Sequence, residues 1–244
     1  MKNTAIIIPS RLGAKRFAGK PLAKINDIPM IIHVLNRAKE SKVGEVFVAT
    51  PDEEILKVVN KNGGNAILTD NQQPSGSDRV YEAYIKVLKN KVDFIINLQG
   101  DMPNIHPDSI SKLDKLMKND NCDIGTLASI VQNDEISNPN VVKVHTEKNL
   151  SHGDFLITKD FFRSKKNLYN KYIYHHCGVY IFTKEALSKY VSFPRSRLEI
   201  ERNLEQMRAI ENNLTIKVGL SNSSPLSVDT EEDLVKVSKE MSAL

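Results

Sequence analysis

The chain has 244 residues, of which 40% are hydrophobic and 26% charged, enough for a sizeable core in a soluble domain. Its 34 lysines and arginines against 30 acidic residues give a net charge of +4, which allows anionic substrates without indicating nucleic acid. The apolar runs are too short for a transmembrane helix or a signal peptide, and two cysteines exclude a disulfide framework or a cysteine-based zinc site. We therefore expect a cytoplasmic enzyme with neither a membrane nor a nucleic acid as partner.

The first half of the chain alternates short apolar runs with stretches of helical spacing. The predicted strands are 5–9, 45–50, 65–69 and 93–98, and the predicted helices are 28–41, 52–60 and 77–89. Asp52 stands at the expected N-cap of its helix. Strands separated by helices predict right-handed crossovers and a parallel sheet, with ligands bound at the carboxyl ends of the strands.

The pattern changes after about residue 120. Strands are predicted at 124–131, 141–145 and 215–219, a long strand or a strand pair at 172–182, and helices at 199–212 and 229–241. Residues 158–171 are polar with no clean period. We expect one domain over residues 1–244, with an inserted region at about 125–200 that serves substrate contact or self-association.

The most informative segment, residues 9–22, directly follows the first predicted strand. It holds four cations, namely Arg11, Lys15, Arg16 and Lys20. Gly13 and Gly19 let the backbone approach a ligand closely. Arginine forks and a lysine charge at a ligand-binding edge suit a triphosphate, although the residue order matches neither a Walker A loop nor G-x-G-x-x-G. A solvated basic surface loop is the alternative, and the sequence leaves it open.

Two aspartates stand where a metal-bound triphosphate would require carboxylates. Asp101 follows the strand at 93–98 after a glycine, and Asp229 precedes the last predicted helix. Mg²⁺ typically takes one or two carboxylates together with substrate phosphates. Each aspartate also has a simpler interpretation, because Gly100-Asp101 is common turn chemistry and Asp229 could be a helix N-cap.

Other polar motifs are less specific. Residues 75–79 (Ser-Gly-Ser-Asp-Arg) would open a helix and offer N–H and hydroxyl groups to a ligand, or would simply cap that helix. His175 and His176 are adjacent in a predicted strand, so their side chains point to opposite faces and cannot form a zinc pair in regular strand geometry. No nucleophile motif is present, and covalent catalysis is not indicated.

The ordered motifs together resemble the 3-deoxy-manno-octulosonate cytidylyltransferase (CMP-Kdo synthetase) family over nearly the whole chain. The segments that carry the resemblance are 9–22, 28–34, 48–50, 75–79, 97–101, 138–144, 176–180, 198–199, 204–208 and 228–234. They include Ser-Gly-Ser-Asp-Arg, Asn-Leu-Gln-Gly-Asp, Asn-Pro-Asn-Val-Val-Lys-Val, Leu-Glu-Gln-Met-Arg and Val-Asp-Thr-Glu-Glu-Asp-Leu.

The resemblance implies a fold and an activity. The fold would be α/β and nucleotide-sugar-transferase-like (Rossmann-like), a mixed sheet flanked by helices with a small inserted substrate or dimerisation subdomain. The reaction would join CTP to 3-deoxy-D-manno-octulosonate (Kdo), a 3-deoxy-ulosonic acid, giving CMP-Kdo and pyrophosphate with Mg²⁺ as cofactor. The resemblance further implies a cytoplasmic homodimer that supplies lipopolysaccharide biosynthesis.

Site residues follow from the resemblance by position. Arg11 and Lys20 would hold the triphosphate, and Asp101 and Asp229 would bind the metal. The sugar acid would lie among Arg16, Gln99, His176 and Glu205. Ser75 and Gly76 would approach the cytosine.

The sequence also departs from the family pattern. Ala18 replaces a proline, Pro51 an aspartate and Ser227 a glycine. Residues 153–160 read Gly-Asp-Phe-Leu-Ile-Thr-Lys-Asp in place of Tyr-Phe-Ser-Arg-Ala-x-Ile-Pro. This segment keeps open a cytidylyltransferase for a related acid sugar, such as 8-amino-Kdo or a nonulosonate. A non-catalytic nucleotide-binding protein of the same fold is the third possibility.

Overall fold

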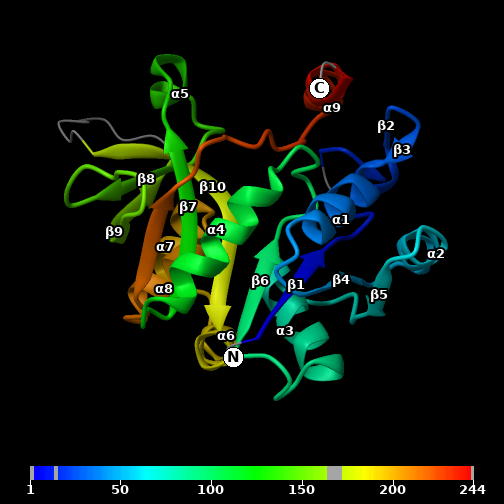
Figure 1. Ribbon diagram of the computed structural model, residues 1–244, viewed down its shortest axis with the longest axis horizontal. Helices are drawn as coiled ribbons and strands as arrows, with labels where there is room; N and C mark the ends of the chain where they lie inside the picture. Colours follow the sequence, from blue (N-terminus) through cyan, green and yellow to red (C-terminus); the bar gives the residue numbers. More distant parts are fainter. Residues whose placement is uncertain (1–2, 14–15, 164–171, 243–244) are drawn as a thin grey trace. The chain divides into compact units, whose positions relative to one another are not determined.

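The computed structural model describes residues 3–13, 16–163 and 172–242, and the chain divides into two compact units (Figure 1). The first unit comprises residues 1–111 and 225–244, and the second comprises residues 112–224. The chain thus leaves the first unit once and returns to it for its last twenty residues. The predicted substrate or dimerisation role of residues 125–200 stays a prediction.

The first unit contains the parallel sheet predicted for the first half of the chain. Its strands lie in the order β5 (Asn65–Leu68), β4 (Glu45–Thr50), β1 (Thr4–Pro9) and β6 (Phe94–Leu98). β1 pairs in parallel with both neighbours, with Ile6 opposite Val46 on one side and Ile96 on the other. Every residue of β1 is buried, which explains why this strand is a continuous apolar run rather than an alternating one.

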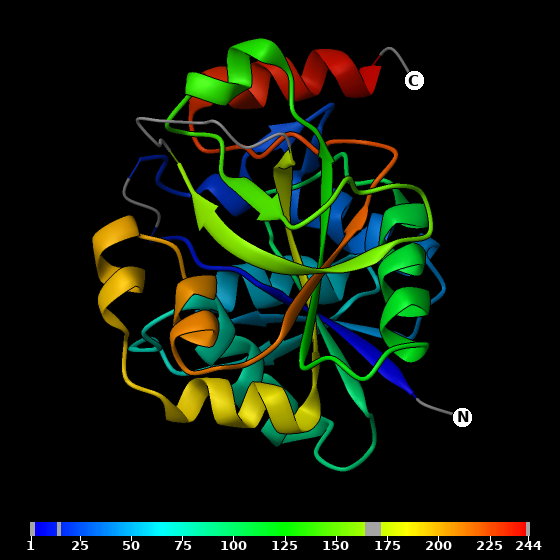
Figure 2. The same cartoon turned by 90° about the vertical axis from the view of Figure 1, so that its left-hand side faces the viewer.

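Helices and a short hairpin complete the first unit. The helices are α1 (Met30–Glu40), α2 (Glu53–Lys61), α3 (Gly76–Val87), α9 (Glu231–Ser242), the first turn of α4 (Pro107–Lys118) and the 3₁₀ helix η1 (Lys20–Leu22). β2 (Lys24–Ile25) and β3 (Ile28–Pro29) form the hairpin, which explains why α1 begins at Met30 rather than Ile28. α9 lies beside this hairpin in both ribbon views (Figures 1 and 2).

A small apolar cluster packs α9 against the N-terminal part of the chain. Ile25, Met30, Val228 and Val237 are completely buried together. Phe17, from the cation-rich segment 9–22 that we call the basic loop, packs against them. Burial of this apolar surface therefore brings residues near both ends of the sequence to one place.

The second unit is built on five strands that close on themselves. Their order is β10 (Ile173–Thr183), β7 (Ile124–Ile130), β11 (Ile216–Leu220), β9 (Phe155–Phe162) and β8 (Lys143–Thr146), and β8 also pairs with β10. β11 and β7 are parallel, whereas the other pairs are antiparallel. The circuit leaves few free strand edges. The unit also contains α5 (Asn133–Ser137), α6 (Lys184–Ser192), α7 (Arg197–Arg202) and α8 (Gln206–Glu211).

The structure corrects several element predictions in the second half. The helix predicted at 199–212 is two helices, α7 and α8, because Asn203 adopts a left-handed φ of 52° between them. The polar segment 158–171 contains the end of a strand, β9, while its residues 164–171 lie outside the described part of the chain. The strand or strand pair predicted at 172–182 is one long strand, β10 (Ile173–Thr183), with an irregularity between Cys177 and Tyr180. The helices α4, α5 and α6 were not predicted.

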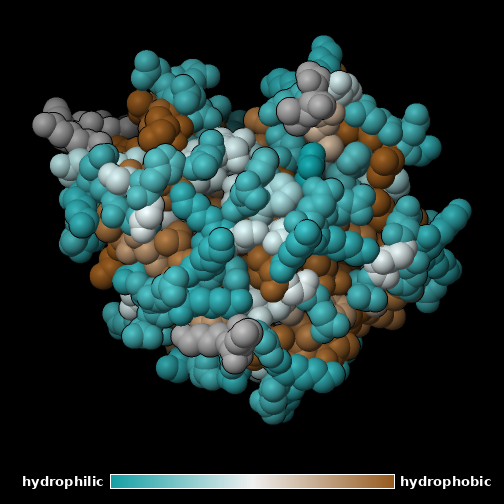
Figure 3. All heavy atoms as spheres, in the orientation of Figure 1, coloured by the Kyte–Doolittle hydropathy of each residue, from teal (hydrophilic) through white to brown (hydrophobic). Residues whose placement is uncertain are grey.

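In the described part of the chain, no helix is long and apolar enough to cross a membrane. Hydrophilic side chains predominate on the face drawn in Figure 3, and hydrophobic ones gather there in small groups. The predicted α/β class is confirmed, with a parallel sheet in the first unit and mixed pairing in the second.

Candidate active site

Four charged side chains of the first unit form what we call the ionic cluster: Arg16, Lys20, Asp101 and Asp229. Lys20 Nζ lies 3.1 Å from Asp101 Oδ2 and 3.6 Å from Asp229 Oδ1, and it donates to the Val228 carbonyl oxygen at 2.6 Å. Arg16 Nη2 lies 2.9 Å from Asp229 Oδ2. The basic loop, the turn after β6 and the segment before α9 therefore meet in space, although more than 80 residues separate each from the next.

The ionic cluster is only partly covered by protein. The side chain of Lys20 is 14% exposed, that of Asp101 is 27% exposed and that of Asp229 is 39% exposed. Such groups are desolvated enough to interact strongly but remain accessible to a ligand. Lys20 is thus not a solvated surface charge, whereas Arg11 and Arg16 are exposed.

Backbone packing places the Asp101 carboxylate. A Cβ atom on Gly100 would lie 2.9 Å from the Pro9 carbonyl oxygen, so only glycine allows this turn to cross the end of β1 so closely. Val228 N–H donates to the Asp101 carbonyl oxygen at 2.9 Å. The prediction that Gly100-Asp101 forms a turn is therefore confirmed, and this turn also positions the Asp101 carboxylate.

The Asp229 side chain does not cap α9. Thr230 Oγ1 accepts from the Asp233 N–H at 3.2 Å. In return, Asp233 Oδ2 accepts from the N–H groups of Asp229 and Thr230, both at 3.1 Å. Thr230 and Asp233 together form the cap, which leaves the Asp229 carboxylate facing Arg16 and Lys20.

Leu12 and Gly19 join the two ends of the basic loop, and we call these two residues its neck. Gly19 N–H donates to the Leu12 carbonyl oxygen at 3.1 Å, and Gly19 has a left-handed φ of 71° that favours glycine. Leu12 N–H donates to Asp52 Oδ2 at 2.8 Å. Asp52 does occupy the N-cap position of α2, but its side chain makes no cap bond, so its expected capping role is wrong. Lys15 lies outside the described residues.

The other first-unit candidates lie near the ends of β1 and β6. Ser75 does cap α3, since its Oγ accepts from the Asp78 N–H at 3.3 Å. Gly76 lies beside Pro9 and Gln99, to which a Cβ atom would approach within 3.6 and 3.8 Å. Ser10 Oγ is buried and has no hydrogen-bond partner among the described residues. A polar group of a ligand would satisfy it.

His176 and Glu205 belong to the second unit. The His176 ring is 7% exposed, lies 3.0 Å from Thr126 Oγ1 and packs edge-on against Phe161. Burial lowers its pKa to about 3, so the ring is neutral. His175 points to the other face, with Nδ1 2.8 Å from Glu135 Oε1. Glu205 precedes α8, and its carbonyl oxygen accepts from Tyr190 OH at 2.9 Å.

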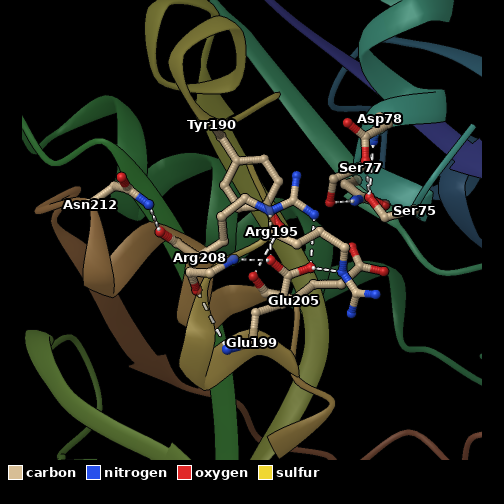
Figure 4. A network of polar contacts seen from close by, with 11 residues as sticks. Ser75, Ser77, Asp78, Tyr190, Arg195, Glu199, Glu205, Arg208 and Asn212 are labelled. Atoms are coloured by element: carbon tan, nitrogen blue, oxygen red, sulfur yellow. Dashed lines mark hydrogen bonds and ion pairs between the residues drawn. The ribbon is translucent and has the colours of Figure 1, made fainter. Parts of the chain in front are cut away.

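A second ionic group, which we call the buried pair, consists of Glu199 and Arg208 (Figure 4). Arg208 donates from Nε and Nη2 to the two Glu199 oxygens, each at 2.8 Å, and its guanidinium stacks 4.7 Å from the Tyr190 ring centroid. Both side chains are at most 2% exposed. Their hydrogen bonds lower the Glu199 pKa, although its burial alone would raise it. The helical spacing of these residues did not indicate their pairing.

The donor set of the ionic cluster fits a magnesium ion. Asp101 and Asp229 supply hard carboxylate oxygens, and Mg²⁺ takes few protein ligands when substrate phosphates complete its shell. Within the described residues, no group of three or more histidine, cysteine or acidic side chains could hold a metal. Both cysteines are buried free thiols whose pKa is raised to about 12 by burial, so neither is a reactive thiolate.

Comparisons with known proteins agree with this geometry. A family model for cytidylyltransferases matches residues 5–216. The chain is 44% identical over 243 residues to a 3-deoxy-manno-octulosonate cytidylyltransferase of Thermodesulfovibrio yellowstonii, with 95% of each chain covered. It is 39% identical over 236 residues to the enzyme of that name from Bartonella bacilliformis, with 96% of each covered.

Solved structures give the same result. The structure of a CMP:2-keto-3-deoxy-manno-octonic acid synthetase complexed with CTP matches with a TM-score of 0.90 at 34% identity, covering 99% of both chains. A UDP-glucose pyrophosphorylase complexed with UDP-glucose matches with a TM-score of 0.72 at 14% identity, covering 100% of this chain and 99% of the other, a likeness of fold alone. The expected nucleotide-sugar-transferase-like fold is confirmed.

Proposed function

The chain belongs to the 3-deoxy-manno-octulosonate cytidylyltransferase family, and from this premise we propose that it transfers the cytidylyl group of CTP to Kdo. The products are CMP-Kdo and pyrophosphate. The observation that carries the proposal is the ionic cluster, in which two carboxylates and two cations from three distant segments face one another.

The reaction requires charge compensation above all. The 2-hydroxyl oxygen of Kdo attacks the α-phosphorus of CTP and loses its proton to solvent, the bond from that phosphorus to the bridging oxygen breaks, and pyrophosphate leaves. Both reactants are anions, so they repel each other until cations offset their charge. Arg11 and Lys20 bind the triphosphate and stabilise the charge that develops on the leaving group.

Asp101 and Asp229 hold the metal in this proposal. Mg²⁺, when bound, supplies a Lewis acid that stabilises phosphate charge and lowers the pKa of a coordinated hydroxyl. Without nucleotide, the Lys20 ammonium and the Arg16 guanidinium together offset the charges of the two carboxylates. An arriving triphosphate offers Lys20 a competing anion, and the sugar acid offers one to Arg16, which leaves the two carboxylates accessible.

The remaining assignments concern the base and the sugar acid. Ser75 and Gly76, at the N-terminus of α3, approach the cytosine. The resemblance assigns sugar-acid contacts to Arg16, Gln99, His176 and Glu205, and these assignments stay predictions. Neutral His176 can donate or accept a hydrogen bond without adding charge. We further propose that the enzyme acts in lipopolysaccharide biosynthesis as a homodimer.

The test is pyrophosphate release from CTP with a panel of sugar acids: Kdo, 8-amino-Kdo and a nonulosonate. The panel is motivated by residues 153–160, most of which belong to β9, where Asp160 pairs with Arg202 of α7. We expect rapid release with Kdo and Mg²⁺ and none with excess chelator. If pyrophosphate were released with only one of the other two acids, that acid would be the substrate instead of Kdo. CTP binding without turnover of any acid would refute the enzymatic proposal.

A further inference from the structure

Asp52 uses its carboxylate in a way that its position in the sequence does not suggest. It occupies the N-cap position of α2, where an aspartate ordinarily accepts from the N–H groups of the first helical turn. Instead, its Oδ2 accepts from the Leu12 N–H at 2.8 Å, forty positions earlier in the chain. The helix start thus forgoes a side-chain cap, while the basic loop gains a charged hydrogen-bond acceptor.

Leu12, the residue that Asp52 binds, is one of the two residues that form the neck of the basic loop. Leu12 donates its N–H to Asp52 and accepts at its carbonyl oxygen from the Gly19 N–H. Arg11 directly precedes this neck, and Lys20 directly follows it. The two hydrogen bonds point in opposite directions and fix the orientation of the peptide groups on either side of Leu12. They thereby set the direction in which the Arg11 and Lys20 side chains extend from the edge of the sheet.

The buried end of β4 holds the backbone of Asp52 in place. Its N–H donates to Thr50 Oγ1 at 3.1 Å, and Thr50 is the completely buried last residue of β4. Ser10 N–H donates to the Ala49 carbonyl oxygen at 2.9 Å, so the start of the loop and the end of β4 are joined through the backbone as well. The carboxylate is therefore held at a defined distance from the neck.

Asp52 also acts on charges next to the neck. Arg79 is 3% exposed, and its Nη1 donates to the Asp70 carbonyl oxygen at 2.9 Å. Burial lowers the Arg79 pKa, the positive charge of Arg11 lowers it further, and the negative charges of Glu82, Asp52 and Asp70 oppose both. The Asp52 carboxylate is thus one of three that offset the repulsion between these two guanidinium groups.

We propose that Asp52 is a positioning residue for triphosphate binding, which acts through its hydrogen bond to Leu12 on the placement of Arg11 and Lys20. The inference rests on the proposed function, because it takes these two cations as the triphosphate ligands. Asp52 does not touch the substrate in this account. Its effect is to pre-organise the loop, so that less of the binding free energy is lost in ordering it.

The experiment compares Asp52→Ala, Asp52→Asn and Glu53→Ala with the wild-type enzyme. Asparagine keeps an oxygen that can accept from Leu12, whereas alanine does not. Glu53 is the matched control, because it is the next carboxylate at the same helix end and, among the residues that the structure describes, its ion pair is with Lys57 at the exposed surface. CTP affinity is measured by calorimetry, KM for CTP and for Kdo by pyrophosphate release, and folding by thermal melting.

We expect Asp52→Ala to weaken CTP binding and raise KM for CTP about tenfold, as loss of a hydrogen bond to a charged group would. KM for Kdo and the melting temperature should stay close to the wild-type values. Asp52→Asn should recover most of the CTP affinity, and Glu53→Ala should match the wild type.

Three results would overturn the inference. The first is unchanged CTP affinity in Asp52→Ala, and the second is an equal rise of both KM values, which indicates a general structural defect. The third is an Asp52→Asn variant as impaired as Asp52→Ala, because the charge and not the hydrogen bond would then matter. Failure of the proposed function is distinct, since it would appear in the wild-type enzyme as absence of turnover with Kdo.

Discussion

The two units each contain a group of paired charges, but they bury it to different degrees. The ionic cluster of the first unit keeps carboxylates that are 27% and 39% exposed. The buried pair of the second unit is nearly inaccessible, and each oxygen of Glu199 accepts from Arg208. Arg195 Nε and the Ser196 N–H add further donors to the same carboxylate (Figure 4).

The difference separates a structural role from a chemical one. The Glu199 carboxylate of the buried pair accepts four hydrogen bonds from protein donors, and both side chains of the pair are at most 2% exposed, so loss of the pair should affect folding. The ionic cluster is held by ion pairs between partly exposed groups, which a triphosphate or a metal can replace, so its loss should affect turnover. Each of the following predictions tests one side of this comparison.

The largest effect is expected at the buried pair. Arg208→Met should lower the free energy of unfolding by about 3–5 kcal/mol, because it leaves the Glu199 carboxylate buried without its main partner. Urea denaturation measures this loss. Arg195→Met is the control, since Arg195 binds the same carboxylate but is 51% exposed, and it should cost less than about 1 kcal/mol. Equal losses in the two variants would contradict the structural role of the buried pair.

On the chemical side, Asp101→Asn should lower kcat by about 10²-fold or more while leaving the urea midpoint unchanged, as loss of a group that acts in the transition state would. Steady-state pyrophosphate release and denaturation of the same sample provide both measurements. Near-normal turnover would remove Asp101 from the metal site.

A pH titration of stability tests the burial of His176. Its pKa falls from 6.5 in the unfolded chain to about 3 in the fold, so between these values the unfolded chain binds the extra proton. The stabilisation from neutral His176 is complete above pH 6.5 and is lost as the pH falls towards about 3. At pH 5 the loss reaches roughly 2 kcal/mol. His176→Gln should flatten this slope in urea denaturation, and an unchanged slope would show that the ring is not buried as described.

The smallest effect is expected at Lys20. Lys20→Ala should raise KM for CTP or lower kcat by about tenfold, because one of several cations that hold the triphosphate is lost. Lys24→Ala, which removes an exposed lysine four residues later, is the control. A CTP titration that is the same for both variants would contradict the phosphate role of Lys20.

The sequence predicted the first unit better than the second because local pattern determines more of it. β1 and β6 are buried on both faces, so their apolar runs stand out from the helices between them. In the second unit, β9 mixes buried, partly exposed and exposed residues without a regular period, and it overlaps the polar segment 158–171. The break between α7 and α8 depends on a single left-handed Asn203, which helical spacing does not reveal.

For the site, the sequence motifs indicated which residues meet but not how they are held. The family resemblance brought Lys20, Asp101 and Asp229 together before any coordinates. It could not show that Asp52 binds the loop rather than its own helix, since both uses fit an aspartate before a helix. The same ambiguity applied to Asp229, and only the cap made by Thr230 resolves it.

That last distinction gives the most direct test of the ionic cluster as the reaction centre. Pyrophosphate release from CTP and Kdo should be measured for Asp229→Asn, with Thr230→Ala as the matched variant. We predict that Asp229→Asn loses about 10²-fold in kcat and keeps its stability. Thr230→Ala should lose about 1 kcal/mol of stability and keep most of its turnover. Wild-type turnover by Asp229→Asn would contradict the account.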